Sequence, residues 1–323
     1  MKLQQLRYLK AIADNNLNIS EAAQRMETSQ PGVSKQIRLL EEELGVRLFH
    51  RNGKHLSALT PIGQQVLARV ERILSEVSNI EHLTGEARHE NIGQLRISTT
   101  HTQARYVLPA VIDLFRQRYP EVRLQLHQGT PRQIVDIAQS GAVDFIIATE
   151  APTFPGQFVM LPAYRWAHCV IMPKDHPLAT QTPLSLAELA TYPIVTYLEG
   201  FTGRGRLDDD FKRHGLSPDI VLTAADADVI KTYVRHGLGL GIIAHMAFDP
   251  QEDHDLVKCP VEPAFSGSIT RIGFRQDAWL RSYMYAFLEL FAPHLTRARV
   301  DAAAAAPAEQ IDEVFASVRV PTH

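Results

Sequence analysis

From residue 93 to about residue 291, short strand-like runs alternate with amphipathic helix-like segments. This alternation constrains the fold most, because repeated strand–helix–strand units form an α/β domain whose ligands bind at the C-terminal ends of the strands. About 200 residues of this pattern are enough for one domain or for two lobes. The predicted strands are 95–99, 122–127, 144–148, 169–172, 194–197, 220–223, 240–244 and 269–274, and the predicted helices are 107–118, 132–138, 207–213, 227–236 and 279–291.

The first 60 residues predict a separate helical head. Apolar residues recur at helical spacing over 3–13, a second helix is expected to begin at an N-cap, Ser20, and a third to open at Ser29 with Pro31 in its first turn. Two helices joined by so short a turn form a helix-turn-helix. Asn52-Gly53 between strand-like flanks predicts a hairpin, which would be the wing of a winged helix.

The charge of the head indicates its partner. Residues 1–60 carry nine Lys/Arg and six Asp/Glu, a net charge of +3, whereas the whole chain carries −3. The first turn of the second helix in a helix-turn-helix meets base edges and phosphates in the major groove, and a wing grips the DNA backbone. The alternative is a protein-interaction module with a basic rim. The residues expected to contact DNA are Ser29, Gln30, Pro31, Ser34, Lys35, Arg38, Arg51 and Lys54.

A long helix is expected to follow, beginning at Thr60-Pro61 and ending at about residue 88. Apolar residues recur at 62, 66, 70, 73, 77 and 80, with alternating four- and three-residue steps. Such a seam favours a dimer, since a helix about 40 Å long is too long to be covered by the head alone. The alternative is a helix that lies on its own body.

In the body, Thr99-Thr100-His101-Thr102-Gln103 follows a predicted strand and opens a helix. Hydroxyls, an amide and unpaired backbone N–H groups at such a turn favour a small anion. Threonines before a helix also serve simply as caps. A second Thr-Gly turn, Thr202-Gly203, follows another predicted strand and favours a cleft between lobes.

Enzyme and membrane functions find no support in the sequence. Gly237-x-Gly239-x-Gly241 precedes a strand and lacks the spacing of a dinucleotide loop, so we expect no enzyme and no cofactor. Cys169 and Cys259 have no metal-type spacing and are expected to be buried apolar residues, with no metal site. Without a signal-peptide core or an apolar run of about 18 residues, we expect a cytoplasmic protein.

Four motifs of the head carry a resemblance: Ser20-x-Ala22-Ala23, Ser29-Gln30-Pro31-x-Val33-Ser34, Leu44-Gly45-x-x-Leu48-Phe49-x-Arg51 and Thr60-Pro61-x-Gly63. They resemble LysR-type transcriptional regulators. That resemblance implies a winged helix-turn-helix at 1–60, a linker and dimerisation helix at 61–88, and a two-lobed effector-binding body at 93–295 that is similar to periplasmic binding proteins. Lobe I would span about 93–162 and 266–295, lobe II about 163–265, and a C-terminal tail 296–323.

Longer motifs in the body at 99–106, 127–131, 148–151, 200–204 and 223–235 resemble family members that activate cysteine biosynthesis and sulfur assimilation genes. This resemblance implies promoter DNA and RNA polymerase as partners, a homodimer or homotetramer, and O-acetylserine, N-acetylserine, sulfate or thiosulfate as effector. The effector-binding residues it implies are Thr100, Thr102, Gln103, Thr149 and Thr202. Glu199 departs from the family pattern, and either points to solvent or changes the effector preference. The alternatives are a cytosolic solute-binding protein and a LysR-type regulator of another pathway with a different small anion.

Overall fold

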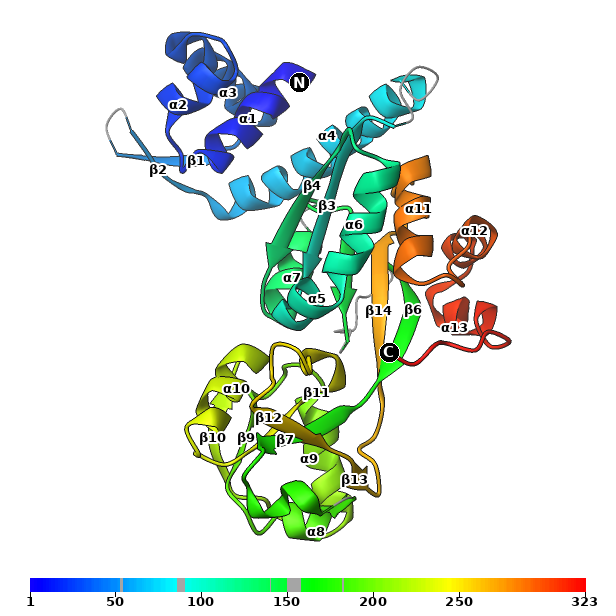
Figure 1. Ribbon diagram of the computed structural model, residues 1–323. Helices are drawn as coiled ribbons and strands as arrows, with labels where there is room; N and C mark the ends of the chain where they lie inside the picture. The colour runs from blue at the N-terminus through cyan, green and yellow to red at the C-terminus, as the bar shows by residue number, and fades with distance from the viewer. Residues whose placement is uncertain (53–54, 86–90, 140, 150–157, 182) are drawn as a thin grey trace. The chain divides into compact units, whose positions relative to one another are not determined.

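The computed structural model describes residues 1–52, 55–85, 91–139, 141–149, 158–181 and 183–323. The chain divides into two compact units, residues 1–89 and residues 90–323 (Figure 1). We call them the N-terminal unit and the C-terminal unit and describe each by itself.

The N-terminal unit begins with the three predicted helices, α1 (Leu3–Asp14), α2 (Ile19–Arg25) and α3 (Gln30–Leu44). The predicted cap of α3 is confirmed, because Ser29 Oγ accepts a hydrogen bond from the Gly32 N–H at 3.3 Å. The predicted cap at Ser20 is wrong: Asn18 caps α2 by accepting from the N–H groups of Ser20 and Glu21. Asn is as good an N-cap as Ser, and the two residues before it, at 16 and 17, bend the chain with positive φ.

The wing is also confirmed, as an antiparallel pair of β1 (Phe49–Asn52) and β2 (His55–Leu59). One buried carboxylate fixes its position on α3. Glu41, whose side chain is 5% exposed, accepts from the Leu48 N–H at 2.8 Å, from the Phe49 N–H at 3.2 Å and from the Arg51 guanidinium at 3.1 Å. These donors compensate for the desolvation of the carboxylate, so α3 and the wing form one rigid piece.

The long helix α4 (Pro61–Gly85) starts where predicted, with Thr60 Oγ1 accepting from the Gly63 N–H at 2.9 Å. The apolar residues of its predicted seam, however, do not all lie on one face of the helix. Val70 is only 2% exposed in the core of the N-terminal unit, whereas Ile73 is 39% and Ile80 60% exposed. At 100° per residue, positions 62, 73 and 80 share one line along the helix, and position 70 lies about 80° away from position 62. The helical head therefore covers Val70, while an outer stripe, defined by 62, 73 and 80, stays exposed.

The described residues of the C-terminal unit form two five-stranded sheets that repeat one pattern: three parallel strands, a fourth strand antiparallel to them, and a fifth strand antiparallel to the fourth. The first sheet has the order β4 (Val122–Gln128), β3 (Gly93–Thr99), β5 (Phe145–Ala148), β14 (Ser268–Arg275), β6 (Phe158–Trp166). The second has the order β10 (Ile220–Ala224), β9 (Ile194–Tyr197), β11 (Leu240–Ala244), β7 (His168–Pro173), β12 (Leu256–Cys259). A two-residue pair joins β8 (Leu184–Ser185) to β13 (Val261–Glu262).

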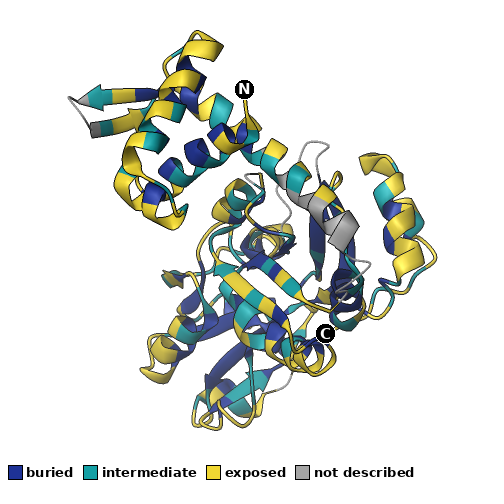
Figure 2. Ribbon diagram, turned by 90° about the horizontal axis from the view of Figure 1, so that it is seen from above, coloured by how far each residue is buried: buried dark blue, intermediate teal, exposed yellow. Residues whose placement is uncertain are grey.

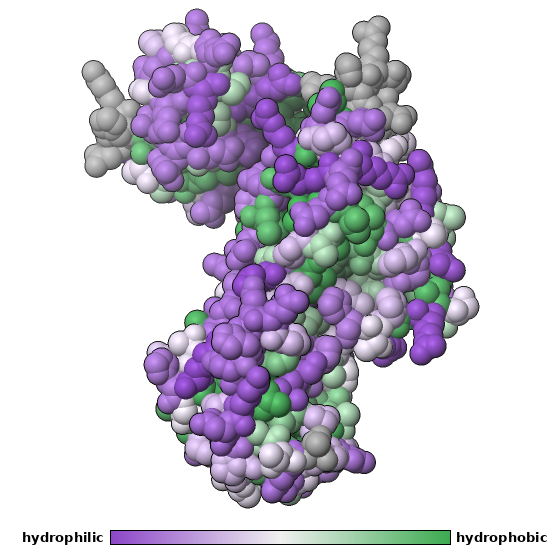
Figure 3. All heavy atoms as spheres, viewed as in Figure 1, coloured by the Kyte–Doolittle hydropathy of each residue, from purple (hydrophilic) through white to green (hydrophobic). Residues whose placement is uncertain are grey.

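The helices of the C-terminal unit cover these sheets, with their exposed faces outward and buried strands within (Figure 2). Its surface is largely hydrophilic, and apolar atoms gather over the side formed by α6 and β4 (Figure 3), where Leu114 is 52% and Leu126 38% exposed. The α-helices are α5 (His101–Tyr106), α6 (Leu108–Arg118), α7 (Pro131–Gln139), α8 (Leu186–Leu189), α9 (Arg204–Arg213), α10 (Ala227–Arg235), α11 (Ser282–Phe291), α12 (Arg297–Ala305) and α13 (Ile311–Val314), and the 3-10 helices are Pro177–Thr180, His245–Ala247 and Ala308–Gln310.

All eight strands predicted for the body are present, but β6, β12 and the two-residue strands β8 and β13 were not predicted. Pro162 interrupts the apolar run of β6, and proline within a run argues against a strand. The structure tolerates it because β6 is an edge strand whose register shifts opposite Arg271. β6 ends at Trp166 and β7 begins at His168, so the chain passes from the first sheet to the second at Ala167.

The tail docks on the first sheet's core, where Ile311 and Phe315 are 5% and 4% exposed. Both cysteines are buried as predicted, and burial raises the pKa of the Cys169 thiol to about 12. In the described ranges, no helix is long and apolar enough to cross a membrane.

We expect Val70→Glu and Ile73→Glu to behave differently although both replace an apolar residue of α4. Val70→Glu places an unpaired carboxylate in the core and should destabilise the N-terminal unit by roughly 3–5 kcal/mol in urea unfolding. Ile73→Glu should leave that stability unchanged and reduce the molar mass measured by light scattering, if the outer stripe pairs copies of the chain. An unchanged mass would show that this stripe does not hold an oligomer together.

Candidate functional sites

The outward face of α3 presents polar side chains. Gln30, Ser34 and Arg38 are spaced by four residues and so share one face, about 80° around the helix from the buried Val33 and Ile37. Of the residues of this segment predicted to contact DNA, five are exposed and the last is half-buried: Ser29, Gln30, Pro31, Lys35, Arg38 and Ser34.

An open depression of about 770 Å³ lies between this face and the wing. Gln30, Ser34, Arg38, Glu41 and Glu42 line it from α3, Arg47 lines it from the segment before the wing, and Arg51 lines it from β1. Its three arginines suit a phosphate backbone, and Glu41 pairs with one of them. The predicted contact Lys54 lies outside the described residues, and Arg51, 23% exposed, already pairs with Glu41. Arg51 therefore has a structural partner that sequence reasoning did not anticipate.

The predicted effector residues come from three separate segments of the C-terminal unit. Thr100, Thr102 and Gln103 follow β3, Thr149 follows β5, and Thr202 precedes α9. Thr102 and Thr202, which belong to the halves built on different sheets, approach each other with their hydroxyl oxygens 3.5 Å apart. Thr102, Gln103 and Thr202 are buried, whereas Thr100 and Thr149 are half-buried. Thr100 is the N-cap residue of α5, but its hydroxyl makes no cap hydrogen bond to the backbone N–H groups of the helix.

Sequence reasoning missed the residue that joins two of these side chains. Thr270 of β14 is fully buried, and its Oγ1 lies 3.5 Å from Gln103 Nε2 and 3.1 Å from Thr149 Oγ1. Trp166 Nε1 donates to the same oxygen at 3.1 Å, and the Tyr164 hydroxyl donates to Gln103 Oε1. A threonine in a strand far along the sequence carries no signal of such a role.

The turn that carries Thr202 is held by its neighbours. Thr202 has φ +41°, unusual for a β-branched residue, and the Nε2–H of His168 donates to its carbonyl oxygen at 2.9 Å. A side chain at Gly203, which has φ +72°, would place its Cβ 3.0 Å from the His168 ring and 3.1 Å from Ser268 Oγ. Burial lowers the pKa of His168 to about 4, so this imidazole is neutral at pH 7. The structure therefore needs glycine at 203.

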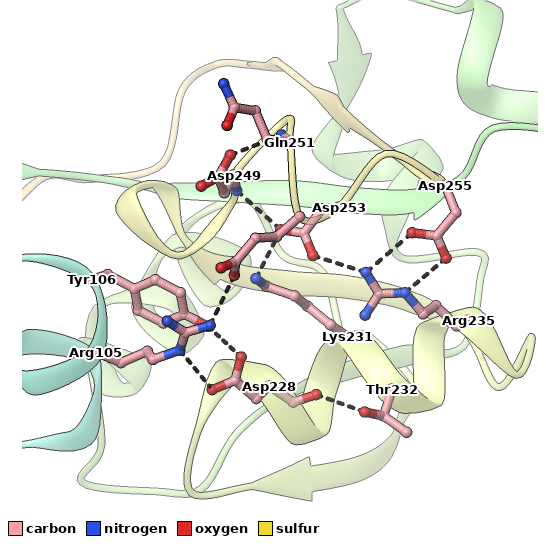
Figure 4. Close-up of polar contacts among 11 residues, drawn as sticks. Arg105, Tyr106, Asp228, Lys231, Thr232, Arg235, Asp249, Gln251, Asp253 and Asp255 are labelled. Carbon is pink, nitrogen blue, oxygen red and sulfur yellow. Dashed lines mark hydrogen bonds and ion pairs between the residues drawn. The ribbon is translucent and has the colours of Figure 1, made fainter.

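Polar contacts tie α5, which carries Thr102 and Gln103, to the second sheet's half. Figure 4 shows Arg105 and Tyr106 of α5 pointing toward Asp228 of α10. The Tyr106 hydroxyl donates to Asp228 Oδ1 at 2.6 Å, and Arg105 donates to Glu252 at 2.8 Å. Burial and the Asp228 carboxylate raise the pKa of Tyr106, so it stays protonated and remains a donor.

A buried ion pair supports the same contact. Lys231 Nζ lies 2.8 Å from Asp253, and both side chains are 3% exposed. The Lys231 ammonium also lies 5.0 Å from the centre of the Tyr106 ring, a cation–π geometry. The Lys231 ammonium thereby packs on the face of the Tyr106 ring, while the Tyr106 hydroxyl donates to Asp228.

Two further groups near this contact need comment. Ligand atoms of His101, Asp226 and Asp228 lie within 4.8 Å of one another, but Asp228 already accepts from Tyr106 and lies 4.0 Å from Arg105, so we assign no metal there. Glu199 is exposed, which agrees with the first of its two predicted placements.

Comparison with known proteins places the chain in a family. The LysR substrate binding domain matches residues 88–296, and the bacterial regulatory helix-turn-helix of the lysR family matches residues 3–64. Together these matches span both units. The chain belongs to the LysR family of bacterial regulators.

Several relatives are similar over nearly the whole chain. The HTH-type transcriptional regulator CysB of Haemophilus influenzae is 49% identical over 94% of this chain and 94% of its own. The HTH-type transcriptional regulator SsuR of Burkholderia cenocepacia is 46% identical over 93% of this chain and 97% of its own. Among solved structures, the cofactor-binding domain of the Cbl transcriptional regulator matches with a TM-score of 0.60 and 43% identity, over 69% of this chain and 92% of that one.

We expect the C-terminal unit to lose stability in mild acid through His168. The pKa of this residue is about 4 in the folded state and 6.5 in an unperturbed chain, so between these values the unfolded state binds the proton and the folded state does not. The free energy of unfolding should fall by about 3 kcal/mol as the pH drops through this window. His168→Gln keeps a donor for Thr202 but does not titrate, and urea unfolding from pH 7 to pH 4 should give it a flatter profile. Superimposable profiles for parent and variant would contradict this role.

Proposed function

We propose that this chain is a DNA-binding transcriptional regulator of sulfur assimilation and cysteine biosynthesis genes, controlled by a small anionic effector, acetylserine or sulfate. The observation that carries the proposal is the approach of Thr102 and Thr202 from the halves built on different sheets, in a chain that also bears a winged helix-turn-helix. The body motifs that resemble regulators of cysteine biosynthesis, and the similarity to CysB, support the pathway.

The chemistry of the proposed effector site supports an anion. Thr100, Thr102, Gln103, Thr149 and Thr202 supply hydroxyl and amide donors and carry no charge. Hydrogen bonds to a charged acceptor are shorter and stronger than neutral ones, so uncharged donors in a buried site are sufficient to hold sulfate or a carboxylate. An effector bound by both Thr102 and Thr202 would change the free energy of any motion that separates the two halves.

Domain bounds, oligomeric state, cellular location and partners are also proposed. We propose a winged helix-turn-helix at 1–60, a linker helix at 61–88, two lobes within 93–295 and a tail at 296–323. The exposed outer stripe of α4 supports a homodimer, which would close to a homotetramer. The protein would act on promoter DNA in the cytoplasm and contact RNA polymerase there.

We expect substitutions of a base-contacting residue and of a phosphate-contacting residue on α3 to differ in how strongly they affect binding to promoter DNA and to scrambled DNA. Gln30→Ala should weaken binding to a sulfur-assimilation promoter fragment by about 1–3 kcal/mol and affect scrambled DNA less. Lys35→Ala should weaken both DNAs equally and reduce the slope of log K against log salt by about 0.9. Lys10→Ala is the matched control, because Lys10 lies on α1 and pairs with Asp14 at 2.8 Å. Fluorescence anisotropy measures all three, and equal losses on both DNAs for Gln30→Ala would refute its role as a base contact.

We expect Thr100→Ala and Thr202→Ala to lower effector affinity about ten- to a hundredfold, since each deletes a donor worth roughly 1.5–3 kcal/mol to a charged acceptor. Calorimetric titration with sulfate, thiosulfate, O-acetylserine and N-acetylserine tests this. Thr191→Ala, on the exposed surface after α8, is the control for the same chemical change, and the exposed Glu199→Gln should bind like the parent. If both threonine variants keep parental affinity for every effector, the site is wrongly placed.

A further inference from the structure

The hydroxyl of Thr270 lies within 3.5 Å of three hydrogen-bond partners, Trp166, Gln103 and Thr149, and it also interacts with the Tyr164 hydroxyl. The chemistry of Trp166 and Gln103 decides whether Thr270 can accept from Thr149. Trp166 Nε1, 3.1 Å away, carries an N–H that only donates, so it occupies one lone pair of Thr270 Oγ1. Gln103 is oriented by Tyr164, whose hydroxyl donates to Oε1 and so turns the amide nitrogen toward Thr270. At 3.5 Å, Nε2 donates to Thr270 and occupies the second lone pair.

With both lone pairs taken, Thr270 cannot accept a third hydrogen bond. The contact of 3.1 Å between Thr270 Oγ1 and Thr149 Oγ1 must therefore run from the Thr270 proton to the Thr149 oxygen. The opposite direction would leave two donors competing for one lone pair in a site where Thr270 is fully buried and no solvent can compensate. Thr149 then keeps its own proton, which points away from Thr270.

We propose that Thr270 is a positioning residue that fixes the half-buried Thr149 as a hydrogen-bond donor to the ligand. The Thr149 proton then remains available to an acceptor on the ligand, such as an oxygen of sulfate or of a carboxylate. This inference rests on the proposed function, and it adds how one donor of the site is oriented toward an oxyanion. Trp166 and Tyr164 do not touch Thr149. Trp166 donates to Thr270, and Tyr164 orients the amide of Gln103, so together they set the direction of the hydrogen bond from Thr270 to Thr149.

The test is a double-mutant cycle on the full-length chain, with sulfate as the probe in calorimetric titration. Thr270→Val keeps the shape of the side chain and deletes the hydroxyl, so Thr149 is no longer oriented, and the Kd for sulfate should rise about tenfold. Thr270→Ser restores the hydroxyl and should return the Kd to within about twofold of the parent. In a Thr149→Ala background, Thr270→Val should have no further effect, because its action passes through Thr149.

A purely structural role would give a different pattern. Thr270→Val would then weaken sulfate binding by the same factor in both backgrounds, and this additivity would overturn the inference, as would a Thr270→Val variant that binds sulfate like the parent. If Thr270→Val does not fold, as judged by circular dichroism, Trp166→Phe takes its place: it frees one lone pair on Thr270, and its weakening of sulfate binding should again vanish in the Thr149→Ala background. Parental protein that binds none of the four candidate effectors would overturn the proposed function and this inference together, whereas parental binding with an ineffective Thr270→Val overturns only the inference.

Discussion

The buried hydroxyl of Thr270 constrains the C-terminal unit, because it loses water on folding and needs partners from distant parts of the chain. Thr270 meets this requirement with Trp166, Gln103 and Thr149, which lie 104, 167 and 121 residues away in the sequence, respectively. Satisfying these groups places the ends of β3 and β5 beside β14. The same network then presents a set of oriented donors to a ligand.

The N-terminal unit solves a similar problem with one carboxylate. Glu41 is buried on α3 and accepts from the Leu48 N–H just before the wing, from the Phe49 N–H at its start and from Arg51 within it. α3 and the wing are thereby held as one rigid surface, so both elements would meet DNA without a further loss of conformational entropy. Arg51 pairs with Glu41 and so stabilises this arrangement, whether or not it also contacts a phosphate as proposed.

Local signals in the sequence were reliable where one short segment decides its own structure. The caps Ser29 and Thr60 begin helices where predicted, because capping depends on hydrogen bonds within three residues. The prediction failed where neighbours compete or compensate: Asn18 displaced Ser20 as a cap, and the edge position of β6 admits Pro162. Val70 belongs to the predicted seam but packs into the core of the N-terminal unit. Periodicity alone does not predict which apolar residues of the helix are covered by the same unit.

The sequence by itself determined most of the elements, the winged helix-turn-helix, the α/β body and the threonine-rich turns of the proposed effector site, since each rests on periodicity, capping or motif spacing. Only the tertiary structure decided which side of α4 is covered, that Arg51 pairs with Glu41, and that Thr270 joins Gln103 to Thr149. These features depend on contacts between residues far apart in the chain, whose distances follow from strand order and burial and leave no periodic trace in the sequence.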